Sequence, residues 1–173
     1  TSMLYRGSEL LSKHVDEPEK ASRPFDVDRD GMVVGEGAGA LVLESAEHAA
    51  SRGAKPLATL AGWSRSFQDP QSPEFSDAIK HSFESALGFA GRSASEISLV
   101  NANASGSVEG DCIEARAIHG VFGSQTPVVA HKSNFGNIGP GTSIVELIGA
   151  VLANVHAVCP ATINCDSIDP DCK

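Results

Sequence analysis

Two places in this chain carry the same order of features: an apolar run, a loop of small and polar residues, and then a segment with helical periodicity. The first apolar run, 97–102, leads into the loop 101–111, and the second, 128–130, leads into the loop 132–143. Strands that alternate with helices predict an α/β fold, here a layered mixed sheet with helices. Because such folds hold their ligand chemistry in the loops that follow strands, these two loops are where function is expected.

Local patterns predict the remaining elements. Further buried strands are expected at the short apolar runs 38–44, 57–63 and 161–165. Helix starts are expected where a capping residue precedes helical periodicity, at Ser45, Ser76, Ser93 and Asp111. With 173 residues and no internal repeat, the chain is predicted to be a single domain.

Charge and hydropathy exclude two classes of partner. The net charge of −9 repels phosphate backbones and anionic lipids, so neither nucleic acid nor a membrane is an expected partner. The longest apolar stretch, 144–158, contains Glu146, Asn154 and His156, and it is too short and too polar to span a bilayer. The start of the chain has no signal-peptide layout, and it favours an excised piece of a longer protein.

The cysteines and histidines do not predict a metal site. The four cysteines (Cys112, Cys159, Cys165 and Cys172) form no C-x-x-C pair, and the six histidines have no ligand spacing. Reduced thiols in a cytoplasmic protein are the favoured interpretation, although an even number of cysteines leaves disulfides open. The acids near Arg23 and Arg29 predict an ion-pair loop rather than a calcium site, because the EF-hand spacing is absent.

Glycine-rich and serine motifs point to no nucleotide or hydrolase chemistry. The glycines at 35–39 precede a predicted strand and lack the dinucleotide spacing, so they favour close backbone approach. The glycines at 136–141 lack a P-loop ending, and neither Ser105 nor Ser143 lies in a complete G-x-S-x-G motif. From the residues alone, the prediction is an α/β domain with two loop sites and no assigned chemistry.

A series of short motifs then resembles the β-ketoacyl synthase family in order and spacing. The motifs are RPFD at 23–26, RDG at 29–31, GEGAG at 35–39, LVLE at 41–44, EHA at 47–49, RGA at 52–54, NA at 101–102, GD at 110–111, EA at 114–115, KS at 132–133, Gly136, VE at 145–146 and P-x-T-x-N at 160–164. The resemblance implies a thiolase-like fold. It further implies that residues 1–173 are the C-terminal domain of such an enzyme, without the N-terminal nucleophile half and the final strands.

The resemblance also implies a set of site residues. The family lysine falls on Lys132 and its acidic partner on Glu146, whereas the two family histidines fall on Asn103 and Asn137. An asparagine amide donates a hydrogen bond but does not act as a general acid or base near neutral pH. The loss of one oxyanion donor costs about 10²–10³ in rate, so the sequence favours reduced or altered catalysis over relics in a structural half-domain.

The implied function is acyl transfer in fatty-acid or polyketide synthesis, by decarboxylative Claisen condensation of acyl and malonyl thioesters. Ser105 and Ser107 align with the two family threonines that contact the pantetheine arm, and each keeps a hydroxyl. The implied partners are an acyl-carrier protein, the N-terminal half of the same ketosynthase and a second subunit in a homo- or heterodimer. No cofactor is expected beyond the carrier's phosphopantetheine. Two alternatives stay open: a non-catalytic partner subunit of the chain-length-factor type, and a thiolase-like enzyme with other acyl chemistry.

Overall fold

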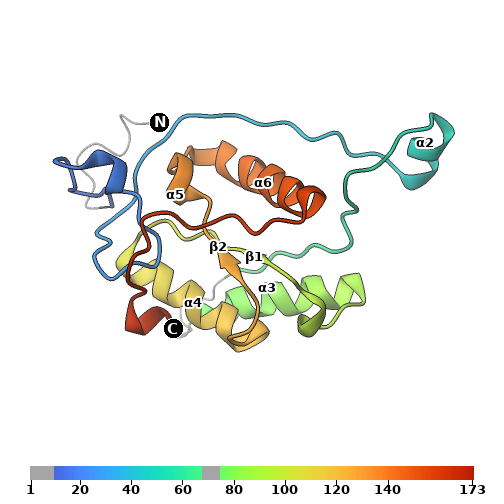
Figure 1. The fold of residues 1–173 in the computed structure, drawn as a ribbon. Coiled ribbons are helices and arrows are strands. Elements are labelled where there is room, and N and C mark those ends of the chain that lie inside the picture. The colour runs from blue at the N-terminus through green and yellow to red at the C-terminus, as the bar shows by residue number, and fades with distance from the viewer. Residues whose placement is uncertain (1–9, 68–74) are drawn as a thin grey trace.

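The computed structural model describes residues 10–67 and 75–173. Figure 1 shows three layers, with α5 and α6 on one side of a small central sheet and α3 and α4 on the other. The strands are β1 (Val100–Asn101) and β2 (Val128–Val129), and the helices are α2 (Ala46–Ser51), α3 (Phe75–Ala90), α4 (Val108–Phe122), α5 (Lys132–Phe135) and α6 (Thr142–His156). Short 3₁₀ turns are η1 (Pro18–Lys20), η2 (Ala94–Glu96), η3 (Gly139–Gly141) and η4 (Pro170–Cys172). The expected α/β layering is confirmed.

The sheet joins the two predicted strand-to-helix loops. β1 and β2 run parallel, with Val100 opposite Val128 and Asn101 opposite Val129. Both strands therefore end at the same edge, and the loops that follow them start next to each other. The core beneath them consists of Val100, Ala102, Ala104, Ile118 and Ala130, with Phe25, Phe83, Ile97 and Phe122 packed against it.

The predicted strands at 38–44 and 57–63 have no strand pairing, and the one predicted at 161–165 contains a turn at Ile163 and Asn164. Each segment instead lies against a neighbouring element. A Cβ on Gly39 would lie 2.8 Å from Ile148 of α6, a Cβ on Gly62 would lie 2.3 Å from Ala86 O of α3, and the Thr162 hydroxyl accepts from Ala130 N at 2.9 Å. A strand needs the backbone of another strand beside it, and within 10–67 and 75–173 these three segments have none.

The glycines at 35–39 allow close backbone contact, as their pattern predicted. A Cβ on Gly35 would lie 1.9 Å from the carbonyl oxygen of Phe135. Gly35 N donates to Asn137 O, and Asn137 N donates in turn to Val33 O at 2.7 Å. The segment that follows Gly31 is thus tied directly to the loop after α5.

Helix starts follow the sequence at two positions and depart from it at two. Ser45 caps α2 by accepting from His48 N, and the Ser93–Glu96 capping box is present before β1. The first turn of α4 is capped by Ser107 and not by Asp111, which is buried inside the helix. Ser76 lies within α3 and not before it, and the preceding residues 68–74 lie outside the described part of the chain.

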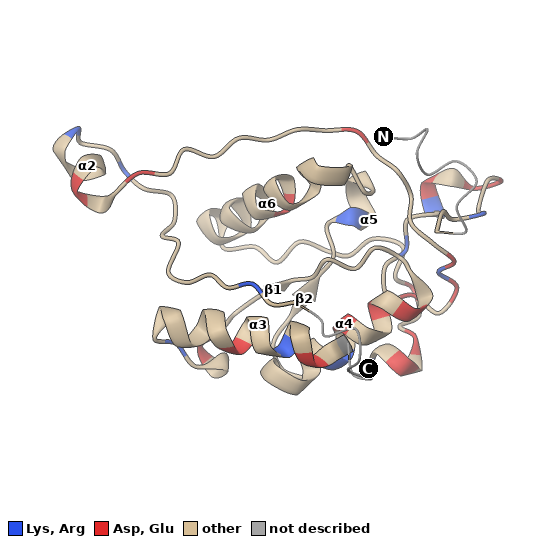
Figure 2. Cartoon of the chain, turned by 180° about the vertical axis from the view of Figure 1, so that it is seen from behind, with Lys and Arg blue, Asp and Glu red and all other residues tan. Residues whose placement is uncertain are grey.

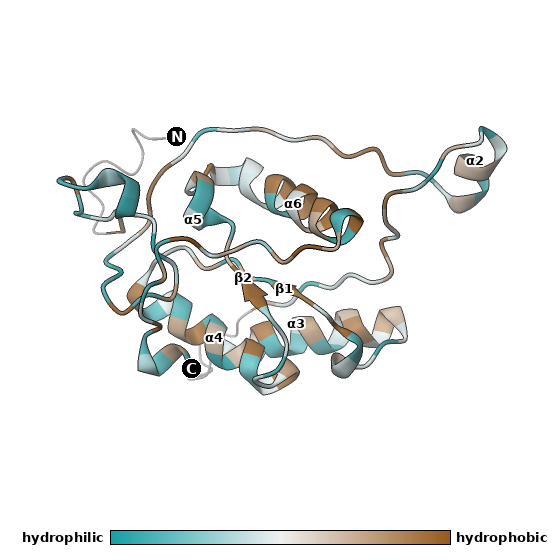
Figure 3. Cartoon of the chain, in the orientation of Figure 1, coloured by the Kyte–Doolittle hydropathy of each residue, from teal (hydrophilic) through white to brown (hydrophobic). Residues whose placement is uncertain are grey.

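Two extended segments, 38–44 and 57–67, leave large apolar side chains in solvent. The resemblance implies such a surface, because it implies that another half and a second subunit pack against this chain. Figure 3 shows hydrophobic residues along both segments. Val42 is 87% exposed, Leu57 66% and Phe67 82%. Exposed apolar patches of this kind are typical of interaction surfaces.

Acidic residues gather along α4 and around the C-terminal turn, as Figure 2 shows. Within the part of the chain that the structure describes, no helix combines the length and hydropathy that a membrane crossing requires.

We expect this chain to self-associate and to bind a hydrophobic dye, because the exposed apolar segments gain free energy when they leave water. Sedimentation velocity over a range of concentrations and dye fluorescence measure both. Val42→Asp should lower both signals, whereas Val15→Asp, at an equally exposed position away from these segments, should not. A monomer that binds no dye at high concentration would contradict the expectation.

Candidate functional site

Lys132 lies at the centre of the candidate site. It is the first residue of α5, directly after the end of β2, and its side chain is 3% exposed. The ammonium lies 2.7 Å from the Glu146 carboxylate on α6. It also donates to the Asn103 side-chain oxygen at 2.9 Å and to the Asn103 carbonyl. The buried Lys132–Glu146 ion pair predicted from the sequence is confirmed.

Glu114 shapes the loop that carries Asn103. Its two carboxylate oxygens accept from Asn103 N and Ala104 N, each at 2.7 Å. Burial raises the pKa of Glu114 above its ordinary value, although these two backbone bonds oppose the shift. Because both bonds run from loop to helix, α4 holds Asn103 beside Lys132.

Asp111 holds the other end of the same loop. Its carboxylate accepts from Gly106 N at 3.2 Å and from Phe25 N at 3.0 Å, so it joins the loop to the N-terminal region. Burial raises the pKa of Asp111, and the Phe25 amide and the Arg29 guanidinium 3.7 Å away oppose that rise. The sequence marked Asp111 as a helix cap, whereas the structure uses it to fix the loop. The signal that the sequence analysis missed is an acidic residue between small and apolar residues of a helical segment, here Gly110, Cys112 and Ile113.

Both ends of the Asn137 side-chain amide bond to other groups of the protein. Its side-chain oxygen accepts from Gly139 N at 2.9 Å and from the Thr142 hydroxyl at 3.2 Å, and its amide nitrogen donates to the Met32 sulfur. No hydrogen bond found in the described residues joins the Asn137 side chain to Lys132 or Asn103. Both asparagine loops nevertheless contact the segment after Gly31, since a Cβ on Gly106 would lie 2.6 Å from Gly31 O. The catalytic roles assigned to these residues stay predictions.

Ser105 and Ser107 have different surroundings. Ser105 lines a cavity of about 300 Å³ together with Ile79, Asn103, Gly110, Ile113 and Glu114. Ser107 is not among the lining residues, and its hydroxyl accepts from Gly110 N as the cap of α4. The cavity is therefore lined by the Ser105 hydroxyl, for which no bond within 10–67 and 75–173 is found, and by the exposed Asn103. The substrate-binding role of the two serines stays a prediction.

His131 is the residue of this region that the sequence did not single out. It precedes Lys132, is 7% exposed, and leaves its buried Nε2 without a hydrogen-bond partner. The ring packs against α6, where a Cβ on Gly149 would lie 2.9 Å from Nε2. Burial lowers the pKa of His131, and Glu146 partly opposes this shift. Nothing in its sequence context distinguishes it from the exposed histidines, because only the packing of α6 buries it.

The arrangement around Lys132 suits the stabilisation of negative charge. The ammonium is hydrogen-bonded to the Glu146 carboxylate and to the Asn103 carbonyl, which are the oxygen atoms that a metal cation would need as ligands. The groups beside the cavity are the amide of Asn103 and the hydroxyl of Ser105, and both are able to donate hydrogen bonds to negative charge.

The ion pairs predicted around Arg23 and Arg29 are present. Arg23 Nε lies 2.9 Å from the Asp26 carboxylate, in an ionic contact without hydrogen-bond alignment. Arg29 pairs instead with Asp169, at 2.7 Å, a partner distant in the sequence.

Lys132→Met should destabilise the fold by about 3–5 kcal/mol, because it leaves the Glu146 carboxylate buried without a partner. Lys132→Met combined with Glu146→Leu should recover most of that loss. The free energy of unfolding in urea measures both. Lys20→Met is the matched control, since its ion pair with Glu17 is exposed and a pair in solvent contributes little to stability. Equal losses from Lys132→Met and Lys20→Met would contradict a buried pair.

Stability should fall as the pH drops below about 6.5, where the unfolded His131 takes up a proton that the buried ring resists. The pKa of His131 is lowered in the folded state, so the unfolded state binds more protons in that window, and the slope from this one group has an upper limit of about 1.4 kcal/mol per pH unit. His131→Gln should flatten the slope relative to the unchanged protein, and His81→Gln on the exposed face of α3 should not. The measurement is the free energy of unfolding between about pH 7.5 and about pH 5, a range that brackets the ordinary histidine pKa. Identical slopes for all three proteins would refute the claim.

Comparison with known proteins agrees with this geometry. Residues 57–166 match the family model described as "Beta-ketoacyl synthase, C-terminal domain", and residues 2–49 match "Beta-ketoacyl synthase, N-terminal domain". The two matches meet between residues 49 and 57, and the assignment of residues 1–173 to one C-terminal domain stays a prediction.

Relatives and solved structures point the same way. The mitochondrial 3-oxoacyl-[acyl-carrier-protein] synthase of Arabidopsis thaliana is 40% identical over 95% of this chain and 38% of its own length. The ishigamide ketosynthase/chain length factor superposes with a TM-score of 0.87 at 38% identity, over 98% of this chain and 41% of that one. A type II polyketide ketosynthase solved in complex with its acyl-carrier protein gives a TM-score of 0.90 at 31% identity, over 99% of this chain and 44% of that one.

The chain spans about two fifths of the length of the curated relatives it matches. The match to the C-terminal family model covers more than half of the chain, and the solved neighbours are thiolase-like ketosynthases that share its fold. This chain belongs to the β-ketoacyl synthase family.

Proposed function

We propose that this chain supplies the decarboxylation and oxyanion site of a β-ketoacyl synthase-like acyltransferase of fatty-acid or polyketide synthesis. The observation that carries the proposal is the buried Lys132–Glu146 pair, whose ammonium bonds to the exposed Asn103 at the lining of a cavity. The substrates would be acyl and malonyl thioesters, joined by decarboxylative Claisen condensation.

The orientation of the Asn103 amide gives this group its chemical role. The Lys132 ammonium donates to the side-chain oxygen of Asn103, so the oxygen faces the ammonium and the NH₂ group is left for the cavity. Asn103 would therefore act as a hydrogen-bond donor at the site. Glu146 neutralises the ammonium, which keeps Lys132 in place rather than in contact with substrate.

The family reaction needs such a donor more than it needs an acid or a base. When the malonyl group loses CO₂, the electron pair of the broken C–C bond becomes an enolate whose charge lies on the thioester oxygen. The new carbanion then attacks the acyl thioester, forms a C–C bond and expels the thiolate that held the acyl group. A positioned NH₂ stabilises both the enolate and the oxyanion of the attack.

The thiolate that holds the acyl chain would come from another part of the assembly. Among the cysteines of the described residues, Cys112 is buried and accepts from Arg29, and Cys165 has a pKa raised by burial. A nucleophilic cysteine requires an accessible thiolate. The N-terminal half of a ketosynthase is the partner that would supply it.

A non-catalytic partner subunit of the chain-length-factor type is the second candidate. The state of Asn137 favours it, because both ends of that amide already bond to groups of the protein, which holds the amide away from the role of a free second donor. In this role the chain would keep the fold and the dimer surface while the other subunit carries out the chemistry.

Further parts of the proposal follow from the same chemistry. An acyl-carrier protein would deliver both thioesters on its phosphopantetheine, and a homo- or heterodimer would cover the exposed segments at 38–44 and 57–67. No cofactor would be needed, because CO₂ loss supplies the carbanion. A cytoplasmic location stays part of the proposal, and one relative carries a mitochondrial name.

The test measures CO₂ release from malonyl-carrier protein and, separately, extension of an acyl chain, with the protein that carries this chain. Under the first function, Asn103→Ala should lower CO₂ release by about 10²–10³-fold. Asn134→Ala, at an exposed asparagine two residues from Lys132, is the matched control and should change neither rate.

The two candidate functions give different results in the same assay. A partner subunit would release no CO₂ alone, would support extension only with a catalytic subunit, and would be insensitive to Asn103→Ala. Stoichiometric, hydroxylamine-sensitive acylation of any of this chain's own four cysteines would refute the proposed origin of the nucleophile.

A further inference from the structure

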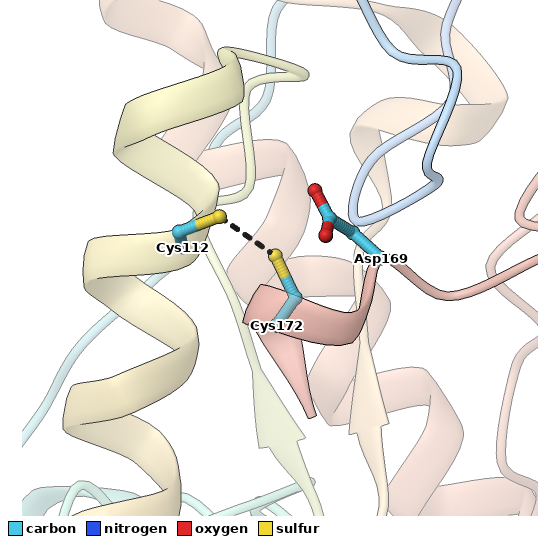
Figure 4. Close-up of side chains that lie close together, drawn as sticks. All are labelled: Cys112, Asp169 and Cys172. Carbon is cyan, nitrogen blue, oxygen red and sulfur yellow. Dashed lines mark hydrogen bonds between the residues drawn. The ribbon is translucent and has the colours of Figure 1, made fainter.

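Two cysteines that are 60 positions apart in the sequence lie side by side. Cys112 is in the first half of α4, Cys172 ends η4, and their sulfur atoms are 3.2 Å apart. Figure 4 shows the two thiols pointing toward each other, with Asp169 beside them. The Cys112 residue is 7% exposed, and Cys172 is half-buried.

The surroundings hold both sulfur atoms in place. Arg29 Nη2 donates to the Cys112 sulfur at 3.0 Å, and Nη1 of the same guanidinium donates to the Asp169 carboxylate at 2.7 Å. Asp169 in turn accepts from Asp171 N, and this bond caps the turn that carries Cys172. The contact therefore does not depend on two freely rotating side chains.

Cys112, Asp169 and Cys172 include the ligand types of a metal site, but the positive charge of Arg29 beside them disfavours a metal cation. The ligand atoms of Cys112, Asp169 and Cys172 lie within 4.8 Å of one another. The Arg29 guanidinium already bonds two of these three groups, so a metal cation would meet a buried positive charge at the same place. A covalent bond between the sulfur atoms has no such conflict.

We propose that Cys112 and Cys172 form a reversible disulfide, which joins α4 to the C-terminal turn. The sulfurs need to approach by about 1 Å to reach disulfide bonding distance. The oxidant is a low-molecular-weight disulfide such as oxidised glutathione. One protein thiol attacks it and releases one small thiol, and the second protein thiol displaces the other. Two protein S–H groups are oxidised, one S–S bond forms, and one small disulfide is reduced to two thiols.

The environment predicts slow formation and slow reduction. Burial, with the contact to Cys112, raises the pKa of Cys172 to about 12. Thiolate is the reactive form, so exchange should be slow at neutral pH. Because burial disfavours the thiolate of Cys172 in the reduced pair, the disulfide should resist reduction once formed.

The bond would also affect the candidate site. Cys112 is next to Asp111, whose carboxylate holds Gly106 in the loop that begins at Asn103. A link between α4 and η4 restricts the motion of the helix that positions this loop.

The experiment equilibrates the purified chain with reduced and oxidised glutathione over a range of ratios, quenches it with acid, and alkylates it in denaturant with N-ethylmaleimide. Mass spectrometry should show four modified cysteines in the reduced chain and two in the oxidised chain, with one peptide pair joining Cys112 to Cys172. The midpoint of thermal unfolding should rise on oxidation by on the order of 5–10 °C.

Variants separate this pairing from others. Cys112→Ser and Cys172→Ser should each abolish the intramolecular bond, and Cys159→Ser, at the exposed cysteine, should retain it. Cys172→Ser provides a second test if the more buried Cys112→Ser fails to fold. A fully alkylatable pair at the most oxidising ratio, a bond through Cys159 or Cys165, or a glutathione adduct on Cys172 alone would each overturn the proposal. Stoichiometric Zn²⁺ binding that blocks alkylation of the reduced pair would overturn it in favour of a metal site.

Discussion

The buried guanidinium of Arg29 connects three regions of the chain that the small sheet does not join. It donates to Asp26 O at 2.7 Å, to Val108 O at 2.6 Å and to the Asp169 carboxylate. A buried cation is costly unless its donors are paired, so these three partners have to be present together. The N-terminal loop, the start of α4 and the C-terminal turn are therefore fixed relative to one another.

The candidate site depends on that connection. α4 presents Asp111 and Glu114 to the loop that carries Asn103, and the loop in turn presents its oxygen atoms to Lys132. Lys132 and Glu146 close the arrangement from the other side of the sheet, through α5 and α6. The buried Lys132–Glu146 pair thus holds the loop from the side of α5 and α6, and Asp111 and Glu114 hold it from the side of α4. The loop is ordered by hydrogen bonds rather than by strand pairing, which suits a segment that has to keep one amide free.

Several parts of the fold could be read from local patterns because local contacts decide them. Ser45 and Ser93 bond the backbone within three residues, and Gly123 ends α4 with a positive φ of 69°. The predicted strands at 38–44 and 57–63 fail for a different reason. Their apolar residues meet the requirement for a strand, but no described segment offers them a partner backbone, so they stay extended with one face in solvent. Strand pairing is a contact between distant segments, and no local pattern contains it.

The same division applies to the site. The sequence by itself determined the position of Lys132 after a strand and of Glu146 one turn into the next long helix, and the resemblance to the β-ketoacyl synthase family paired them. It also determined that Asn103 and Asn137 carry amides in place of imidazoles. Only the tertiary structure decided that Asn103 lines a cavity while the amide of Asn137 is hydrogen-bonded to Gly139, Thr142 and Met32. It alone placed Cys112 beside Cys172. Side-chain chemistry is encoded residue by residue, whereas a hydrogen-bond partner or a thiol neighbour depends on which distant segments folding brings together.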